Sequence, residues 1–109
     1  MTALSPQAFQ ILLSLADGAN LHGYAIIQDV RERTSGEMVL TASTLYAAIK
    51  RMLDAGLIAE VDAPAETGGA PRRCYRITKV GGTAARREAE RLARTVAMAR
   101  DKHLLPRRT

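Results

Sequence analysis

The sequence predicts a mainly helical fold with a small β-hairpin, arranged as a winged helix-turn-helix plus a C-terminal dimerisation helix. Apolar residues recur at helical spacing in three segments before residue 56. Two short alternating segments then flank a loop rich in Pro and Gly, and a last helical segment follows. We therefore expect a winged helix-turn-helix domain over residues 1–78, and a dimerisation helix with its tail over residues 79–109.

The first helix is expected within residues 4–18. Ser5 is a natural N-cap, and Pro6 suits the first helical position because its missing N–H has no partner there anyway. Gly18 can adopt the left-handed conformation that ends a helix. These signals predict both ends of this element.

The second helix is expected within residues 21–36. Asn20 is a plausible cap, and Gly36 ends the segment. The next four residues, 37–40, are too few for a helix, and we interpret them as a minimal strand.

The third helix is expected from about residue 42 to residue 55. Its apolar side chains fall on one side of a helical wheel: Leu45, Ala48, Ile49, Met52 and Leu53. The other positions lie opposite or at the flanks: Ser43, Thr44, Tyr46, Ala47, Lys50, Arg51 and Asp54. A helix that only packs needs the first face, so the second face requires another explanation.

Two short strands are expected at residues 57–61 and 73–78, where residue types alternate. The segment between them holds two Pro and two Gly and predicts the loop of a hairpin. Arg72 and Arg73 stand at the return of this hairpin, the wing, where we expect them to reach a DNA backbone. Charges that prevent edge-to-edge aggregation are the alternative explanation.

The last helix is expected from Thr78 to about Leu105. Small and apolar residues step through it by four and three, as in a short heptad seam: Ala85, Ala89, Leu92, Val96 and Ala99. A domain of 78 residues leaves no core for so long a helix, so we interpret it as a dimerisation arm. A helix lying back along its own domain is the alternative.

Composition limits the partners of this chain. Its net charge is +5 and its pI about 10.0, with nine basic and three acidic residues after position 78. Such basicity favours nucleic acid first and an anionic membrane second, unless the basic tail is only a solvated helix. The single cysteine excludes an internal disulfide. Since no segment reaches about 18 apolar residues and no signal peptide is evident, we expect a cytoplasmic protein without a membrane partner.

The polar face of the third helix carries the groups that a DNA-reading helix needs. Ser43 and Thr44 can donate to phosphate near the positive end of the helix dipole. Tyr46 can hydrogen-bond phosphate, and Lys50 and Arg51 can meet phosphate or a guanine edge. Simpler explanations exist: Ser43 could be an N-cap, Tyr46 could pack under the wing, and Lys50 could be merely solvated. The combination on one face favours DNA.

Three sequence blocks resemble the PadR family of transcriptional regulators. HGY at residues 22–24 opens the second helix, and TLY at 44–46 precedes GLI at 56–58. RCYRIT at 73–78, with Gly81, corresponds to the R-x-Y-x-L-T-x-x-G block of the family. The resemblance covers about residues 5–82, and the single C-terminal helix resembles the short subgroup.

The resemblance implies a homodimeric repressor that binds double-stranded DNA in a sequence-specific way. It also implies a small aromatic effector that releases the repressor, as in some family members. The residues that it implicates in DNA binding are Ser43, Thr44, Tyr46, Lys50, Arg72 and Arg73.

An enzyme is not expected. The sequence has no phosphate-binding Gly loop, no paired metal-ligand spacing and no nucleophile motif, so we expect no cofactor and no metal. His22, beside Gly23 at a helix start, is expected to cap that helix, and Cys74 to be a half-buried, inert thiol. The remaining alternative is a winged-helix protein-interaction module without DNA binding, which the cations of the third helix and the wing disfavour.

Overall fold

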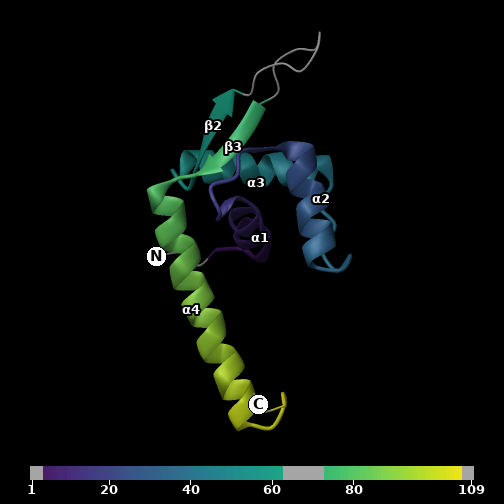
Figure 1. Ribbon diagram of the computed structural model, residues 1–109, viewed down its shortest axis with the longest axis vertical. Helices are drawn as coiled ribbons and strands as arrows, with labels where there is room; N and C mark the ends of the chain where they lie inside the picture. Colours follow the sequence, from purple (N-terminus) through teal and green to yellow (C-terminus); the bar gives the residue numbers. More distant parts are fainter. Residues whose placement is uncertain (1–3, 63–72, 107–109) are drawn as a thin grey trace.

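A computed structural model describes residues 4–62 and 73–106. Within these ranges the elements follow in the order α1 (Pro6–Leu15), β1 (Leu21–His22), α2 (Gly23–Arg33), α3 (Ala42–Asp54), β2 (Ile58–Asp62), β3 (Arg73–Ile77) and α4 (Lys79–Asp101). The first three helices gather together, the sheet stands at one end of them, and α4 descends past α1 (Figure 1). The predicted winged-helix architecture with one C-terminal helix is confirmed.

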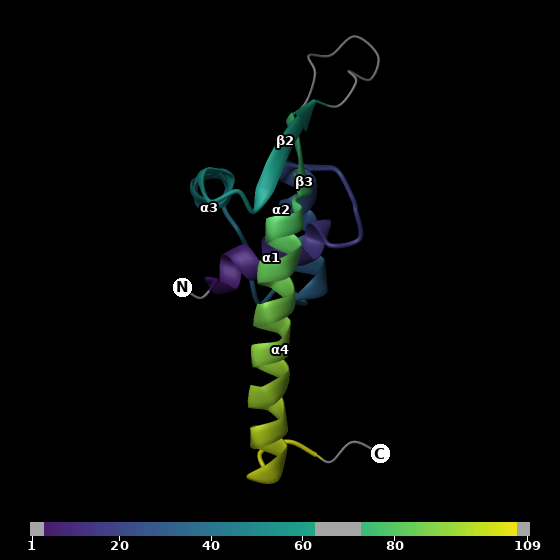
Figure 2. The ribbon, with the colours of Figure 1, turned by 90° about the vertical axis from the view of Figure 1, so that its left-hand side faces the viewer.

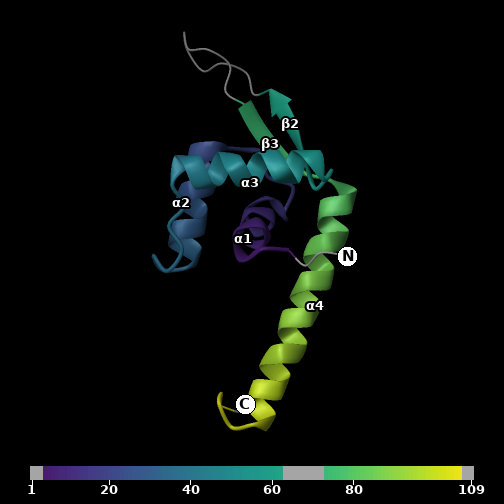
Figure 3. The same ribbon diagram turned by 180° about the vertical axis from the view of Figure 1, so that it is seen from behind.

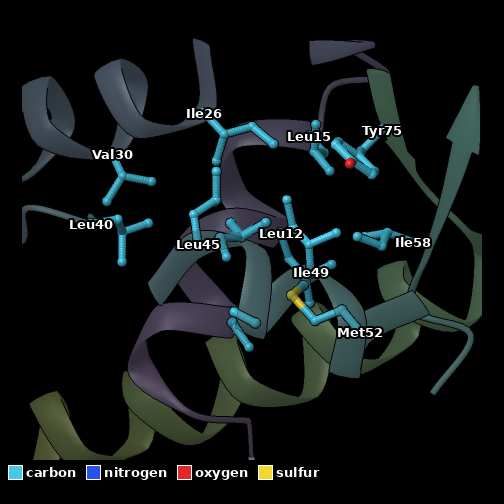
Figure 4. Packing of buried hydrophobic residues seen from close by; sticks show 13 residues of the cluster. Leu12, Leu15, Ile26, Val30, Leu40, Leu45, Ile49, Met52, Ile58 and Tyr75 are labelled. Carbon is cyan, nitrogen blue, oxygen red and sulfur yellow. The ribbon is translucent and has the colours of Figure 1, made fainter. Parts of the chain in front are cut away.

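The core lies between α1, α2, α3 and the sheet. Its fully buried large side chains come from the three helices: Ile11, Leu12, Leu15, Ile26, Val30 and Leu45. Ile58 of β2 and Tyr75 of β3 close the cluster from the sheet side (Figure 4). Burying one such aliphatic side chain contributes about 1.5–3 kcal/mol, so this cluster is the main stabilising feature of the domain.

The cap of α1 follows the sequence prediction, whereas the cap of α2 does not. Ser5 Oγ accepts a hydrogen bond from the N–H of Ala8 at 3.1 Å. The predicted cap Asn20 is wrong, because α2 begins three residues later, where His22 Nδ1 accepts from the N–H of Ala25 at 3.2 Å. The other expectation, that His22 caps this helix, is confirmed.

The sheet has three antiparallel strands in the order β1-β3-β2. The two-residue strand β1 pairs Leu21 with Tyr75, and it was not predicted. The strand predicted at residues 37–40 is wrong, because the backbone there is held by a helix end. Thr34 Oγ1 accepts from the N–H of Met38 at 3.0 Å, and Leu40 turns into the core.

The turn between α3 and β2 is joined to the start of α4. Gly56 has a φ of +74°, which ends α3 and directs Leu57 back along it. Thr78 Oγ1 donates to the carbonyl oxygens of Gly56 at 2.6 Å and Leu57 at 3.0 Å, and it accepts from the N–H of Gly81 at 3.0 Å. A single threonine therefore caps α4 and fixes where the helix leaves the domain.

Helix α4 ends at Asp101, so the predicted end near Leu105 is wrong. His103 takes a φ of +62°, and the N–H of Leu104 donates to the carbonyl of Ala99 at 2.9 Å. This closure turns the chain at once. The lower half of α4 extends beyond the other elements (Figure 2). No helix in residues 4–62 or 73–106 combines the length and apolarity that a membrane crossing requires.

Candidate nucleic-acid interface

Helix α3 is divided into a buried and an exposed face. The buried face holds Leu45, Ala48, Ile49 and Met52. Every residue predicted to contact DNA from this helix is exposed: Ser43, Thr44, Tyr46, Lys50 and Arg51. The helix crosses the outside of the domain, with no other element in front of it when seen from behind (Figure 3). A long partner can therefore approach this face without displacing another element.

The hydroxyl groups at the N-terminus of α3 differ in whether they are hydrogen-bonded within the chain. Thr41, rather than Ser43, is the N-cap, and its Oγ1 accepts from the N–H of Thr44 at 3.1 Å. The same oxygen donates to Thr44 Oγ1 at 2.9 Å. The Ser43 hydroxyl makes no hydrogen bond with any residue that the structure describes. Ser43 is thus available to a ligand, and the alternative that it is only an N-cap is wrong.

Tyr46 combines packing with exposure. Its hydroxyl oxygen lies 2.5 Å from the position that a β-carbon on Gly23 would occupy, so the ring rests over the first residue of α2. The side chain is nevertheless 51% exposed. The lack of a side chain at Gly23 lets this phenol lie against the helix start.

The structure describes one of the two wing arginines that were predicted to contact DNA. Arg73 begins β3, is exposed, and places Nε 3.4 Å from Glu60 Oε1. An ion pair this exposed is worth little, about 0–1 kcal/mol, so it does not fix the guanidinium in place. Arg72 lies outside the described residues.

The fold brings Arg73 and Tyr46 together at one hollow of about 520 Å³. We call it the tyrosine hollow, and its lining is His22, Gly23, Tyr24, Tyr46, Arg73 and Tyr75. Sequence reasoning had not assigned Tyr24 or Tyr75 to the interface, although both belong to the HGY and R-x-Y blocks. The pairing of β1 with β3, which places these blocks side by side, was not predictable from a two-residue strand.

The surroundings of the Tyr75 hydroxyl disfavour its ionised form. Burial raises its pKa above the ordinary value, and the negative charge of Glu60 raises it further. The group therefore remains a hydrogen-bond donor at neutral pH.

A sequence model described as "Transcriptional regulator PadR-like family" matches residues 11–87. These residues include α3, both wing strands and the Thr78–Gly81 junction. The chain belongs to the PadR-like family of transcriptional regulators. No curated protein matches it.

Solved structures resemble this PadR-like chain over most of its length. A transcriptional regulator from Clostridium thermocellum has 29% identity and a TM-score of 0.71, covering 86% of this chain and 89% of that one. A PadR family transcription regulator from Clostridium difficile has 28% identity and a TM-score of 0.70, covering 89% and 98%. Bacillus subtilis PadR in complex with operator DNA has 23% identity and a TM-score of 0.63, covering 72% and 44%, and it supports the fold alone.

The PadR-like chain presents its predicted dimerisation residues unevenly along α4. Leu92 and Val96 are large apolar side chains with 37% and 36% of their surface exposed. Ala89 is exposed and Ala99 is half-buried, whereas Ala85 packs against the core of its own chain. The outer part of the seam is therefore the part that can meet a second copy.

A second face of α4 borders an apolar groove of about 780 Å³. The groove lies between Leu4 before α1, Leu57 after α3, and one side of α4. On that side Glu88 is almost fully buried and accepts from Arg91 at 2.9 and 2.5 Å. The hydrogen bonds from Arg91 lower the pKa of Glu88, so this pair is ionised at neutral pH.

The described residues hold no group of three or more His, Cys, Asp or Glu side chains that could bind a metal ion. Cys74 is buried in β3, deeper than the half-buried position predicted from the sequence. Members of the matched family are transcription regulators rather than enzymes.

Proposed function

We propose that this PadR-like chain is a homodimeric repressor that binds operator DNA with α3 in the major groove. The observation that carries the proposal is the exposed face of α3, which holds hydroxyl, phenol and cationic groups on a helix whose other face is buried. The wing, with Arg72 and Arg73, would lie on the neighbouring backbone. The Bacillus subtilis neighbour, which shares the fold of this chain, was solved in complex with operator DNA.

The charges of α3 support a polyanionic partner. Lys50 and Arg51 form no ion pair with a carboxylate among the described residues. Cations left unpaired on an open face can neutralise phosphates and release counterions. The alternative, a winged-helix module that binds only proteins, gives no reason for this arrangement.

We propose residues 1–78 as the DNA-binding domain and residues 79–109 as the dimerisation segment. Helix α4 spans about 34 Å at 1.5 Å per residue, and its outer half leaves the domain. Pairing through Ala89, Leu92, Val96 and Ala99 would present two α3 helices related by a two-fold axis. The half-sites would then lie one DNA turn, or a multiple of it, apart.

We propose that a small aromatic effector releases the repressor and that the groove beside α4 receives it. The groove touches both the DNA-binding domain and the dimerisation helix, so a ligand there can change their relative position. Guanidinium groups of Arg91 and Arg94 border its apolar floor, and such groups stack on aromatic rings. A cytoplasmic location accords with this role.

Selection of fragments from the genomic DNA of the source organism tests the proposal. Purified protein should retain a small set of fragments that share a two-fold symmetric sequence, and binding should weaken steeply with salt. Added aromatic acids should release the fragments if the effector part holds. Recovery of fragments without any common sequence, or binding that salt leaves unchanged, contradicts a sequence-specific regulator.

A further inference from the structure

The tyrosine hollow contains a polar group, the Tyr75 hydroxyl, that the predicted DNA contacts do not use. Only 4% of the surface of Tyr75 is exposed, yet its hydroxyl forms no hydrogen bond with any described residue. No side-chain nitrogen or oxygen of the described residues is both fully enclosed and without a hydrogen-bond partner. The Tyr75 hydroxyl must therefore be in contact with solvent. Since Tyr75 lines the hollow, this is where the hydroxyl meets solvent. A buried phenol of this kind normally has a hydrogen-bond partner, and none of the residues that the structure describes supplies one here.

The start of α2 adds further donors at the same place. The first N–H groups of a helix have no acceptor within it, and His22 Nδ1 satisfies only that of Ala25. The amides of Gly23 and Tyr24 thus lie at the positive end of the α2 dipole, and both residues line the hollow. Tyr46 brings its hydroxyl over Gly23, where a side chain would collide with it.

The charges around the hollow favour an anion with several acceptor oxygens. Arg73 supplies a guanidinium whose contact with Glu60 uses only Nε, at 3.4 Å, so its terminal nitrogens can serve another acceptor. Glu60 makes this contact, and Asp62 stands opposite Arg73 in the register of β2 and β3, so a phosphate has to compete with two carboxylates for the guanidinium. Three phenols, one guanidinium and a helix start together match a tetrahedral phosphate.

We propose that the tyrosine hollow holds one phosphate of the DNA backbone, bound by Tyr24, Tyr46, Tyr75, Arg73 and the first amides of α2. The inference rests on the proposed DNA binding and adds to it two residues and a single shared phosphate. The hollow joins α3 to the wing through residues of both, so the phosphate fixes the angle at which α3 enters the groove. Binding there is independent of base sequence.

A double-mutant cycle that combines protein variants with modified DNA tests whether these tyrosines bind the same phosphate. Duplexes are made in which one phosphate at a time is replaced by a neutral methylphosphonate, and affinities are measured for wild-type protein, Tyr75→Phe and Tyr24→Phe. On unmodified DNA each variant should bind about tenfold more weakly, the loss expected for one hydrogen bond to a charged group. At one phosphate position per half-site, the methylphosphonate should weaken wild-type binding. On that modified duplex the affinities of the two variants should lie within about twofold of the wild-type affinity.

Controls separate this inference from the proposed function. Tyr24 is 63% exposed, so Tyr24→Phe should fold as wild type does, and thermal unfolding checks both tyrosine variants. Lys50→Ala should lose affinity on every duplex without coupling to the same phosphate. If the affinity losses from the tyrosine variants and from the methylphosphonates add at every phosphate position, the inference is overturned, although the proposed DNA binding is not. If inorganic phosphate binds at Tyr75 while the effects of the protein variants and the methylphosphonates on DNA affinity simply add, the hollow holds a free anion, and the inference is also overturned. Absence of any salt-dependent DNA binding by wild type overturns the proposed function itself.

Discussion

The carbonyl oxygen of Leu57 lies well inside contact distance of the position that a β-carbon on Gly81 would occupy. The Leu57 carbonyl carbon is 2.9 Å from the same position, so the obstruction is backbone that cannot rotate away. Thr78 holds the two segments at this separation through its hydroxyl. The glycine at the end of the R-x-Y-x-L-T-x-x-G block is therefore required by close packing of α4 on the α3–β2 turn.

Gly81→Ala and Gly82→Ala should change stability in opposite directions. The first forces the helix away from Leu57 and should lower the free energy of unfolding by about 1–3 kcal/mol. The second meets only Arg86 Nη1 at 3.7 Å and should raise stability by up to about 1 kcal/mol, because alanine favours a helix. Urea denaturation measures both. Equal stabilisation by the two substitutions would refute the close approach.

Arg33 joins α2 to α1 and should contribute to stability. Its guanidinium donates to Asp29 Oδ2 at 2.7 Å, Gln10 Oε1 at 2.8 Å, the Gln10 carbonyl at 2.8 Å and Ser14 Oγ at 2.7 Å. Lysine cannot reproduce this fork, so Arg33→Lys should lower the free energy of unfolding by about 1–2 kcal/mol. Arg31→Lys, on the exposed side of α2, is the matched control and should change it by less than about 0.5 kcal/mol.

The pH dependence of this contact follows from Asp29. The hydrogen bond from Arg33, and then that from Ser14, lowers the pKa of Asp29 below its ordinary 3.8. A lowered folded-state pKa means that the stabilisation is present above pH 3.8 and is lost as pH falls through the folded value. Since the carboxylate is 38% exposed, the effect should stay below about 1 kcal/mol. Unfolding of wild type and Asp29→Asn from pH 7 to pH 2.5 should converge on acidification. A gap that widens toward acid contradicts the assignment.

Leu92→Glu should convert the proposed dimer to monomers. A charge at an apolar position of the seam would be buried between two helices without a partner. Met98→Glu lies on the same helix, is 59% exposed and falls off the seam, so it should leave the dimer intact. Light scattering coupled to gel filtration gives the mass of each variant. Dimers that persist in Leu92→Glu would remove the α4 seam from the interface.

Sequence patterns predicted the helices well because their signals are local. The apolar period of α3 and the Ser5–Pro6 start of α1 both appear where they were expected. Strand β1 could not be predicted, since two residues carry no alternation and pair with the distant Cys74 and Tyr75. The end of α4 was misplaced because His103, not a glycine, takes the left-handed position.

The candidate site was predictable in part for the same reason. The exposed face of α3 follows from helical periodicity, and exposure of Ser43, Lys50 and Arg51 agrees with it. The meeting of Tyr24, Tyr46 and Tyr75 depends on how three separate elements pack, which no local pattern encodes. The HGY block pointed to the site in the sequence. The need for its glycine became clear only from the structure, where the Tyr46 hydroxyl lies against Gly23.

The salt dependence of DNA binding in Lys50→Ala tests the central claim most directly. The affinity for a selected fragment is measured over a range of salt concentrations for wild type, Lys50→Ala and Lys102→Ala, a lysine at the far end of α4 from α3 (Figure 1). If α3 carries the contact, Lys50→Ala should flatten the plot of log affinity against log salt by about one unit per bound protomer, and Lys102→Ala should match wild type. Identical slopes for wild type and Lys50→Ala, with a flatter slope for Lys102→Ala, would contradict DNA binding through α3.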